Sequence, residues 1–378
     1  MARIAVFHPH LMAGGGGEAV CMNVLQALED RHDVTLVTIT DPDIGRLDDY
    51  YDTDVGTVDV DRGGWTGPVI TKLSDGLSIP DGSLWKIRAS LFKRACDLDA
   101  YDLVVSTYNE FAFRLPAVQY VHYPTGAGHG RGATERAYLR LVEMVGGYDR
   151  DRVGRSTLLA NSEWTATSVE SRYGVRPRVV YPPVDVSALR AASRPWESRE
   201  HGFVAVGRLS PEKNVERSIR IVSALRSRGR DVHLHIVGPG GGTEYGTRIR
   251  RRADATDGIH FEGELPRQEL LDLLGSHRYG LHGMRAEHFG MVVAEFAAAG
   301  ALPFVHDSGG QVEIVDGREE LCYGGTADAV ERIEGLLENP ERQREIGRQL
   351  STEVERFGRE RFRAEIRGVV STALAGID

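Results

Sequence analysis

The chain has 378 residues, more than one hydrophobic core usually holds, so about two domains are expected. Its formal net charge of −9 argues against nucleic acid as a partner. Pro, Gly or charged residues interrupt every apolar run before the roughly 18 residues that a membrane span needs. The first ten residues read as a strand and lack the features of a signal peptide, and the three cysteines are too widely spaced for a disulfide framework. We therefore expect a cytoplasmic protein.

Lysine is scarce in this sequence. Of the 46 basic residues all but four are arginine, the exceptions being Lys72, Lys86, Lys93 and Lys213. An ammonium is a compact point charge, whereas a guanidinium is a planar fork. A retained lysine therefore marks a position where arginine is expected to be less suitable.

Short β-branched segments alternate with helical patterns along the chain, which is typical of parallel sheets with crossover helices. One series of predicted strands covers 3–9, 33–40, 56–61, 102–107, 117–124 and 156–162, and a second covers 202–209, 232–238, 259–263, 278–283 and 301–307. A proline-containing, weakly periodic segment at 179–202 separates the two series. We predict two doubly wound, Rossmann-like α/β domains, 1–190 and 191–378, the second carrying the terminal helices. Ligands bind such sheets at the carboxyl ends of their strands, so the site is expected in a cleft between the domains.

The most informative stretch is RAEHFGMVVAEFAAAGALPFVHDSGG, at 285–310, because it carries two carboxylates, Glu287 and Glu295. If a helix begins near Phe289, the separation of eight positions between Glu287 and Glu295 spans roughly 12 Å. The helix start would offer amides to a phosphate, and Gly290 would let the backbone come close. The amides in question are those of Phe289, Gly290, Met291 and Val292. This length suits a nucleotide sugar, with a sugar at one carboxylate and a ribose at the other. The alternative is that Glu287 caps the helix and Glu295 pairs with a buried arginine.

Two cations bracket a strand-to-helix turn in GRLSPEKN, at 207–214: Arg208 and Lys213. Such a pair suits a diphosphate whose charge grows as a bond to it breaks. The alternative is a solvated loop with ordinary surface charges. Because Lys213 is the only lysine in the second half of the chain, we favour the functional interpretation.

Glycines and a histidine mark the first half of the chain. The run Gly14–Gly17 lies between a strand and a helix and could bring backbone amides close to a phosphate or sugar, or could be a flexible turn. His122 lies at the carboxyl end of a predicted strand. A histidine at this position could have a structural or a catalytic role. No histidine or cysteine cluster has metal-ligand spacing along the chain, so no bound metal is predicted.

Taken together, these motifs resemble the retaining GT-B glycosyltransferases of the large mannosyl- and glucosyltransferase family. The resemblance covers essentially the whole chain and rests on GGGGE, ANSEWTA, GRLSPEKN and the spacing of Glu287 and Glu295. FHPHLMAGGGGE, YVHYPTG and GLHGMRAEHFGMVVAEFAAAG are similar to the α-1,2-mannosyltransferases that extend dolichol-linked oligosaccharides in N-glycan assembly. The resemblance implies a metal-independent hexosyltransferase that uses a nucleotide sugar, GDP-mannose or a UDP-sugar, and no further cofactor. Its acceptor would be a glycan or a polyprenyl-linked glycan.

The resemblance also implies roles for single residues. Glu287 would hold the donor sugar's hydroxyls and Glu295 the ribose, while Arg208 and Lys213 would stabilise the leaving diphosphate. Gly15, Gly16 and Gly263 would make further contacts with the donor. His122 would lie beside the reacting carbon.

Two rival functions stay open. One is a nucleotide-sugar epimerase or hydrolase of the same fold, and the other is a non-catalytic scaffold that binds a nucleotide sugar. The eukaryotic enzymes of this resemblance carry an N-terminal membrane anchor, whereas we expect none from the first residues of this sequence. The basic amphipathic segment 84–95 could instead hold the protein to an anionic membrane, peripherally on its inner face. The alternative is a surface helix that packs its apolar face inward.

Overall fold

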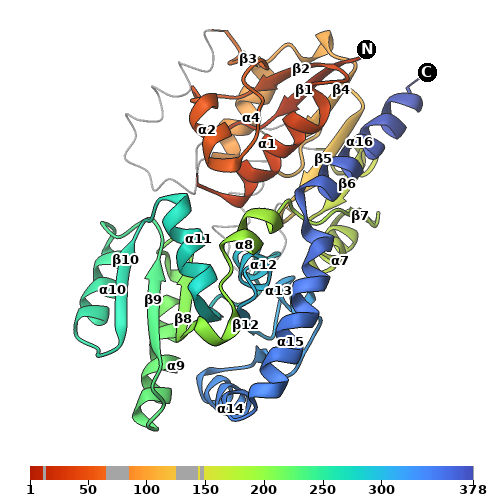
Figure 1. The fold of residues 1–378 in the computed structure, drawn as a ribbon. Coiled ribbons are helices and arrows are strands. Elements are labelled where there is room, and N and C mark those ends of the chain that lie inside the picture. The colour runs from red at the N-terminus through yellow and green to blue at the C-terminus, as the bar shows by residue number, and fades with distance from the viewer. Residues whose placement is uncertain (12–13, 65–84, 125–143, 145–148, 378) are drawn as a thin grey trace. The chain divides into compact units, whose positions relative to one another are not determined.

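The computed structural model describes residues 1–11, 14–64, 85–124, 144 and 149–377. The chain forms two compact units (Figure 1). Unit 1 comprises Met1–Pro183 and Arg359–Asp378, and unit 2 comprises Val184–Gly358. No helix in the described ranges is long and apolar enough to cross a membrane.

Unit 1 is built on a seven-stranded sheet in the order β3-β2-β1-β4-β5-β6-β7, with every pairing parallel. β5 is buried along its whole length, and the last four residues of β1 are buried. This is expected of parallel strands that are covered on both faces. The strands are β1 Arg3–Phe7, β2 Asp33–Val37, β3 Asp59–Asp61, β4 Leu103–Ser106, β5 Ala117–Val121, β6 Thr157–Ala160 and β7 Arg178–Val179.

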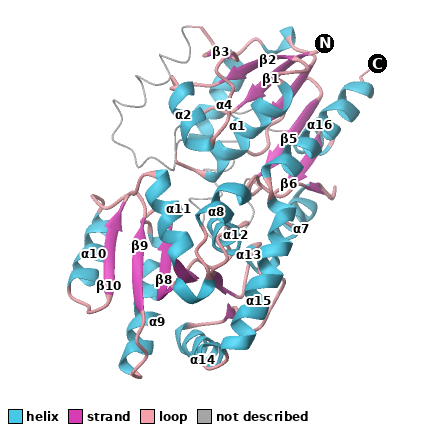
Figure 2. Ribbon diagram, viewed as in Figure 1, coloured by secondary structure: helices cyan, strands magenta, loops and turns pink. Residues whose placement is uncertain are grey.

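The helices of unit 1 include the last helix of the chain (Figure 2). In α16 the buried residues Phe362, Ile366, Val369 and Val370 recur at helical spacing, and this face packs against α1 and β5. The sequence-based expectation placed all terminal helices in the second domain, whereas α16 belongs to unit 1 through its contacts with α1 and β5. The helices are α1 Gly16–Leu28, α2 Ile44–Tyr51, α4 Trp85–Ala95, α6 Arg150–Gly154, α7 Glu163–Tyr173 and α16 Arg359–Ala375, with the 3-10 helix η1 Leu98–Ala100.

Unit 2 is a second parallel sheet, of six strands, in the order β10-β9-β8-β11-β12-β13. The strands are β8 Glu200–Val206, β9 His233–Val237, β10 Ile259–Gly263, β11 His277–His282, β12 Leu302–His306 and β13 Cys322–Tyr323. The helices are α8 Val186–Ala192, α9 Val215–Ser227, α10 Glu244–Asp254, α11 Arg267–Ser276, α12 Met291–Ala298, α13 Gln311–Ile314, α14 Thr326–Leu337 and α15 Pro340–Glu353, with 3-10 helices η2 Trp196–Ser198, η3 Pro211–Lys213 and η4 Val354–Phe357.

The prediction of two doubly wound α/β domains is confirmed, and each of the eleven predicted strand segments overlaps an observed strand. The two strands that were missed, β7 and β13, have two residues each. Segments this short show no periodicity from which a strand could be predicted.

Candidate active site

The carboxyl edge of the unit 2 sheet brings together the loops that follow β8, β9 and β10. A Cβ added at Gly238 would lie only 2.0 Å from the Gly207 carbonyl oxygen, so the β8 and β9 loops touch because position 238 is glycine. The Gly238 amide donates to the Gly263 carbonyl at 2.7 Å, which places Gly263 at the same edge. A small pocket there is lined by Ala205, Val206, Gly207, Lys213, Val215, Ser218, Leu281, His282 and Gly283.

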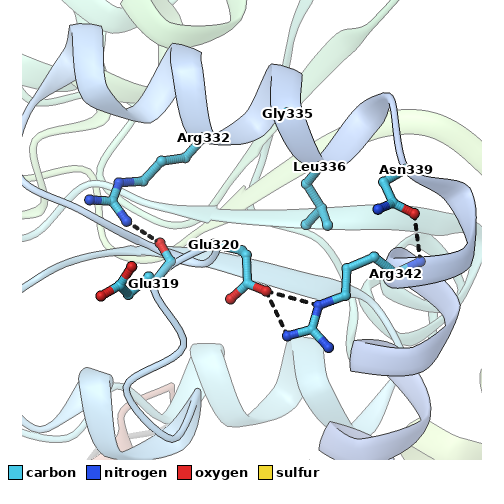
Figure 3. A pocket seen from close by; sticks show the side chains of 7 residues that line it. All are labelled: Glu319, Glu320, Arg332, Gly335, Leu336, Asn339 and Arg342. Carbon is cyan, nitrogen blue, oxygen red and sulfur yellow. Dashed lines mark hydrogen bonds and ion pairs between the residues drawn. The ribbon is translucent and has the colours of Figure 1, made fainter.

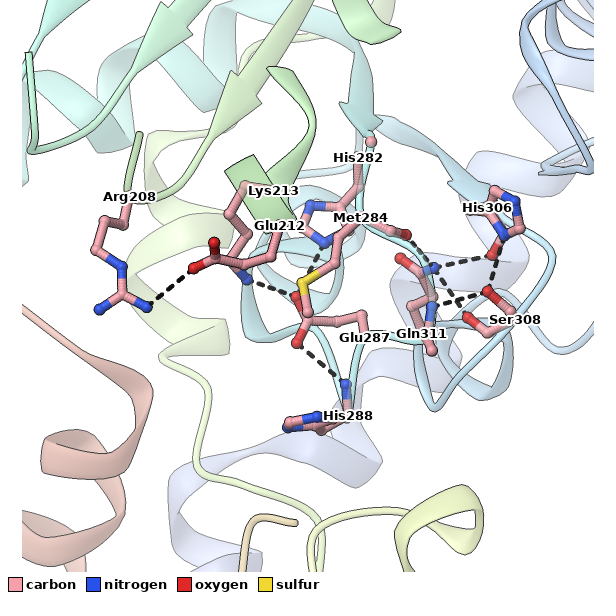
Figure 4. Close-up of polar contacts among 12 residues, drawn as sticks. Arg208, Glu212, Lys213, His282, Met284, Glu287, His288, His306, Ser308 and Gln311 are labelled. Carbon is pink, nitrogen blue, oxygen red and sulfur yellow. Dashed lines mark hydrogen bonds and ion pairs between the residues drawn. The ribbon is translucent and has the colours of Figure 1, made fainter. Parts of the chain in front are cut away.

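Lys213, Glu287 and His282 form the centre of this edge (Figure 4). Lys213 lies at the end of η3 and its Nζ donates to Glu287 Oε2 at 2.6 Å. His282, the last residue of β11, donates from Nε2 to the same oxygen at 3.1 Å. The other oxygen, Oε1, accepts the His288 amide at 3.1 Å. One buried carboxylate therefore fixes a lysine from one loop and a histidine from a neighbouring strand.

The charge of Glu287 is stabilised in place. Burial alone would raise the pKa of this carboxyl, but the hydrogen bond from His282 and the positive charge of Lys213 outweigh it and hold the pKa well below its ordinary value. Glu287 is therefore an anion at neutral pH, and Lys213 faces it as a cation. The pair is not at the surface, since the side chains are 24% and 11% exposed.

The loop that carries Glu287 is held rigidly. Ala286 has a positive φ of 50°, and its amide donates to Ser308 Oγ at 2.8 Å. Gly310 N donates to the Glu287 carbonyl at 2.8 Å. The buried Gln311 side-chain amide donates to the carbonyls of Met284, His306 and Ser308. The backbone strain at Ala286 is thus offset by hydrogen bonds on both sides of it.

Helix α12 begins at Met291, two residues later than predicted, because Gly290 is in the left-handed region with a φ of 97°. The amides of Val293 and Ala294 both donate to the Gly290 carbonyl, so those of Met291 and Val292 precede the first intrahelical bond. Phe289 is buried and packs its ring on Phe357.

The structure matches only one half of the alternative interpretation, in which Glu287 caps the helix and Glu295 pairs with an arginine. Glu287 does not cap α12, whose N-cap is Gly290 without a side-chain cap. Glu295 does pair with an arginine, accepting from Arg267 Nη1 at 3.2 Å. Arg267 begins α11, and no motif in the sequence points to its pairing with Glu295.

Arg208 and Lys213 bracket the turn but are not joined. The Arg208 side chain is 71% exposed and its Nη2 lies 3.5 Å from Glu212, four residues on. Figure 4 shows it pointing away from the Lys213–Glu287 pair. A long exposed ion pair of this kind holds a side chain only weakly. Arg208 is therefore able to turn toward an anion.

Unit 1 carries its own polar group at the carboxyl edge of its sheet. His122 follows β5, and its Nε2 donates to the Thr107 carbonyl at 3.0 Å. His8 follows β1, and its Nδ1 lies 2.9 Å from Thr107 Oγ1. Burial, together with the nearby His122 and His10, lowers the pKa of His8 to about 3, so it is neutral. A Cβ at Gly17 would lie 3.7 Å from His122 Nε2 and 4.0 Å from His8 Cε1, so the start of α1 packs against both rings.

The glycine loop is ordered by a tyrosine that the sequence did not indicate. The Tyr51 hydroxyl accepts from the amides of Gly14 and Gly15, at 3.0 and 2.9 Å, and donates to the Gly15 carbonyl at 2.8 Å. Gly15 is the N-cap of α1 and Gly16 its first residue. The Gly15 amide is thus already bonded, which leaves the helix start at Gly16 as the better contact for a ligand.

Residues 85–95 form helix α4, and Leu84, the first residue of the predicted amphipathic segment, lies outside the described residues. Phe92 is buried in the core with Phe7, Val104 and Phe113. Lys93 also turns inward, with its Nζ donating to the Ala112 carbonyl at 2.8 Å, and burial together with nearby arginines lowers its pKa to about 8. The side chain of Leu91 is exposed. Of the four basic residues in this segment, Lys86, Arg88, Lys93 and Arg94, Lys93 therefore faces inward and not toward a membrane.

A separate pocket of about 420 Å³ lies between α14 and the start of α15 (Figure 3). Its two arginines are already bonded to groups of the pocket wall. Arg342 donates to Glu320 and Arg332 donates to the Glu319 carbonyl, while Asn339 accepts the Arg342 amide. It contains none of the residues described above, and we assign it no role.

The comparisons with known proteins agree with this geometry. Residues 191–351 match the family model described as glycosyl transferases group 1, and residues 14–188 match glycosyltransferase family 4. Two solved structures share the fold over 98–100% of both chains: Anabaena Alr3699/HepE in complex with UDP and glucose, at a TM-score of 0.71 and 16% identity, and sucrose-phosphate synthase from Thermosynechococcus elongatus, at 0.74 and 17%.

Curated relatives extend the likeness along the whole chain. GDP-Man:Man(3)GlcNAc(2)-PP-Dol alpha-1,2-mannosyltransferase from Xenopus laevis is 26% identical, over 96% of this chain and 85% of its own length. The human protein of the same name is 27% identical, over 95% and 84%.

Proposed function

The chain belongs to the group 1 glycosyltransferases of GT-B fold, and from this premise we propose that it transfers mannose from GDP-mannose to a glycan carried on a polyprenyl diphosphate. The names of the relatives, which state a GDP-mannose donor and a dolichol-linked acceptor, support this choice. The observation on which the proposal rests is the Lys213–Glu287–His282 group beside the start of α12.

The donor's diphosphate would lie between Lys213 and the first amides of α12. A lysine ammonium has three donors, and one of them is bonded to Glu287, so two are left for phosphate oxygens. The amides of Met291 and Val292 add donors where the helix dipole favours negative charge. Arg208 would give up its weak pair with Glu212 and complete the cluster.

Glu287 is foremost a positioning group in this proposal. An ionised carboxylate accepts about four hydrogen bonds, and Lys213, His282 and the His288 amide use three of them. About one position on Oε1 remains for a hydroxyl of the donor sugar. Glu295 keeps capacity on its second oxygen for a ribose hydroxyl, beside the contact with Arg267.

The proposed transfer of the sugar needs no covalent intermediate with the enzyme. The acceptor hydroxyl oxygen forms a bond to the anomeric carbon, and the bond from that carbon to the β-phosphate oxygen breaks with its electron pair leaving on the diphosphate. The hydroxyl proton passes to the departing phosphate. Lys213, Arg208 and the α12 amides stabilise the charge that develops there, which is a task that needs no metal ion. Attack on the face that the phosphate leaves accounts for retention of configuration.

His122 is proposed to lie against the donor sugar near the reacting carbon. Its Nε2 donates to the Thr107 carbonyl, which orients the ring at the carboxyl edge of the unit 1 sheet. Gly16, at the start of α1, would border the sugar or the phosphate. Gly263, at the end of β10, would border the base.

A peripheral membrane contact through α4 is proposed with a smaller set of residues than the sequence suggested. Leu91 and Arg94 are exposed, whereas Lys93 faces inward. Flotation with anionic vesicles should weaken in Leu91→Ser/Arg94→Glu. Unchanged flotation in this double variant would contradict the contact.

Isothermal titration calorimetry tests the donor site. We expect GDP-mannose to bind and the Arg208→Gln variant to bind it at least about tenfold more weakly, because one cation worth more than about 1.4 kcal/mol on a diphosphate is lost. Arg344→Gln is the matched control, because Arg344 also makes an exposed arginine–glutamate pair, with Glu197 at 3.4 Å. Equal affinity in both variants would contradict the assignment. Binding followed by conversion to an epimer would instead identify an epimerase.

A further inference from the structure

Three histidines gather at the opposite edge of the unit 2 sheet from Lys213 and Glu287. His233 and His277 are the first residues of β9 and β11, and His235 lies two residues along β9 on the same face. One ring nitrogen from each lies within 4.8 Å of the others. The sequence-based prediction of no metal considered spacing along the chain, and it missed this cluster because the sheet, not the chain, brings 233 and 277 together.

A glycine makes the approach of two of these histidines geometrically feasible. β8 lies between β9 and β11, and Gly202 of β8 pairs with His233. A Cβ at Gly202 would lie 2.2 Å from His233 Nε2, so the ring lies over a strand position that has no side chain. The His233 Nε2 thereby reaches 3.1 Å from His277 Nε2, across the intervening strand.

These distances fit the coordination shell of one ion. Two imidazole nitrogens bound at about 2.05 Å to a tetrahedral Zn²⁺ are about 3.3 Å apart. A carboxylate completes the group: Glu200 Oε2 lies 3.4 Å from His233 Nε2 and 3.8 Å from His277 Nε2. His233 Nε2, His277 Nε2 and Glu200 Oε2 therefore have nearly the mutual spacing of three ligand atoms around one tetrahedral ion.

Hydrogen bonds to the Nδ1 atoms of His277 and His235 orient these two rings in the way that zinc-binding histidines are usually oriented. His277 Nδ1 donates to the Leu273 carbonyl at 2.9 Å, so its Nε2 offers a lone pair toward the cluster. His235 Nδ1 donates to Glu262 Oε1 at 2.7 Å, so Nε2 is the nitrogen assigned to the ion. A carbonyl or carboxylate behind the far nitrogen is the usual support of a zinc-bound histidine.

We propose that His233, His235, His277 and Glu200 bind a structural Zn²⁺ that joins β8, β9 and β11. Three imidazoles and one carboxylate suit zinc rather than Mg²⁺ or Ca²⁺, which prefer oxygen ligands. Four protein ligands leave no open position for catalysis. The site is accessible to an ion, because Glu200 is 53% exposed while His277 is 2% exposed. It lies at the starts of the strands, so it takes no part in the proposed transfer.

Zinc titration of the full chain without an affinity tag, after dialysis against EDTA, tests this proposal. We expect one Zn²⁺ per chain and a rise in melting temperature on binding. His277→Gln and Glu200→Gln should weaken binding at least about tenfold, as for lost zinc contacts. His201→Gln is the matched control, because His201 follows Glu200 on β8 and faces the other side of the sheet. Absence of zinc binding, or an equal loss in His201→Gln, would overturn the proposal.

Two glycine-to-alanine variants, one at the cluster and one as a control, test the site without removing any ligand. Gly202→Ala should displace the His233 ring and weaken zinc binding about tenfold or more, although all four ligands remain. Gly335→Ala is its control, because a Cβ there meets no atom within 4 Å. X-ray absorption of the zinc-loaded protein should show three imidazole nitrogens and one oxygen. Unchanged zinc affinity in Gly202→Ala, or a shell of oxygens only, would contradict the site.

Discussion

The pairing of Lys213 with Glu287 makes a quantitative prediction for a double-mutant cycle. Lys213→Met removes the ammonium and leaves the Glu287 carboxylate, 11% exposed, without its counter-ion. Glu287→Gln keeps the shape but turns an amide donor or a neutral acceptor toward the ammonium. In the double variant neither charge remains, so the penalty of an unpaired charge disappears.

The magnitude follows from the burial of the pair. Removing one partner of a buried ion pair costs about 3–5 kcal/mol, and because Lys213 is 24% exposed we place each single variant at the lower end, about 3 kcal/mol. For a unit of this size the expected fall in melting temperature is about 6–12 °C. The double variant should lose clearly less than the sum of the two, with a coupling energy of about 2 kcal/mol.

Urea unfolding followed by circular dichroism on the wild type and three variants measures the cycle, with the free energy of unfolding taken from the transition that contains unit 2. Ligand-free protein is used, so donor binding does not enter. Additive single effects, with a coupling below about 0.5 kcal/mol, would refute the ion pair as an energetic unit.

Three further predictions concern other parts of the two units. Glu295→Gln should weaken nucleotide-sugar binding about tenfold in calorimetry with little change in melting temperature, because its pair with Arg267 is partly hydrated; unaltered affinity would remove Glu295 from the donor site. The pKa of Lys93 is lowered from 10.5 to about 8 in the folded protein, so the unfolded chain binds more protons between pH 8 and 10.5. The free energy of unfolding should therefore rise with pH across this window, by at most about 3 kcal/mol. Urea titrations of Lys93→Met should lack this rise. Gly238→Ala should lower the melting temperature by several degrees and reduce donor affinity, since its Cβ would collide with the Gly207 carbonyl; a neutral effect in thermal melts would contradict the close approach.

Much of the fold could be predicted because the signals were local. Short buried runs such as those of β4 and β5, which are rich in valine, indicate strands of a parallel sheet by themselves. The position of α16 was not predictable in this way. Its apolar stripe indicates that it packs on a domain, but which of two similar sheets it covers depends on contacts with α1 that no local pattern encodes.

For the candidate site, residue types were easier to predict than partners. Lysine's scarcity pointed to Lys213, but its bond to Glu287 crosses 74 positions of sequence. His282 ends β11 and His8 follows β1 directly, as His122 follows β5, and the same rule applied to them would have found both. Arg267 and Tyr51 gave no signal, because their roles arise only when distant loops meet at the ends of the sheet.

Mass spectrometry of a synthetic polyprenyl-diphosphate-linked oligosaccharide incubated with GDP-mannose tests the central claim most directly. The account predicts that the acceptor gains one hexose in the donor's anomeric configuration, as read by NMR, and that Lys213→Met forms no product. Consumption of GDP-mannose to free mannose or an epimer without a glycosylated acceptor would contradict it, as would equal transfer by Lys213→Met.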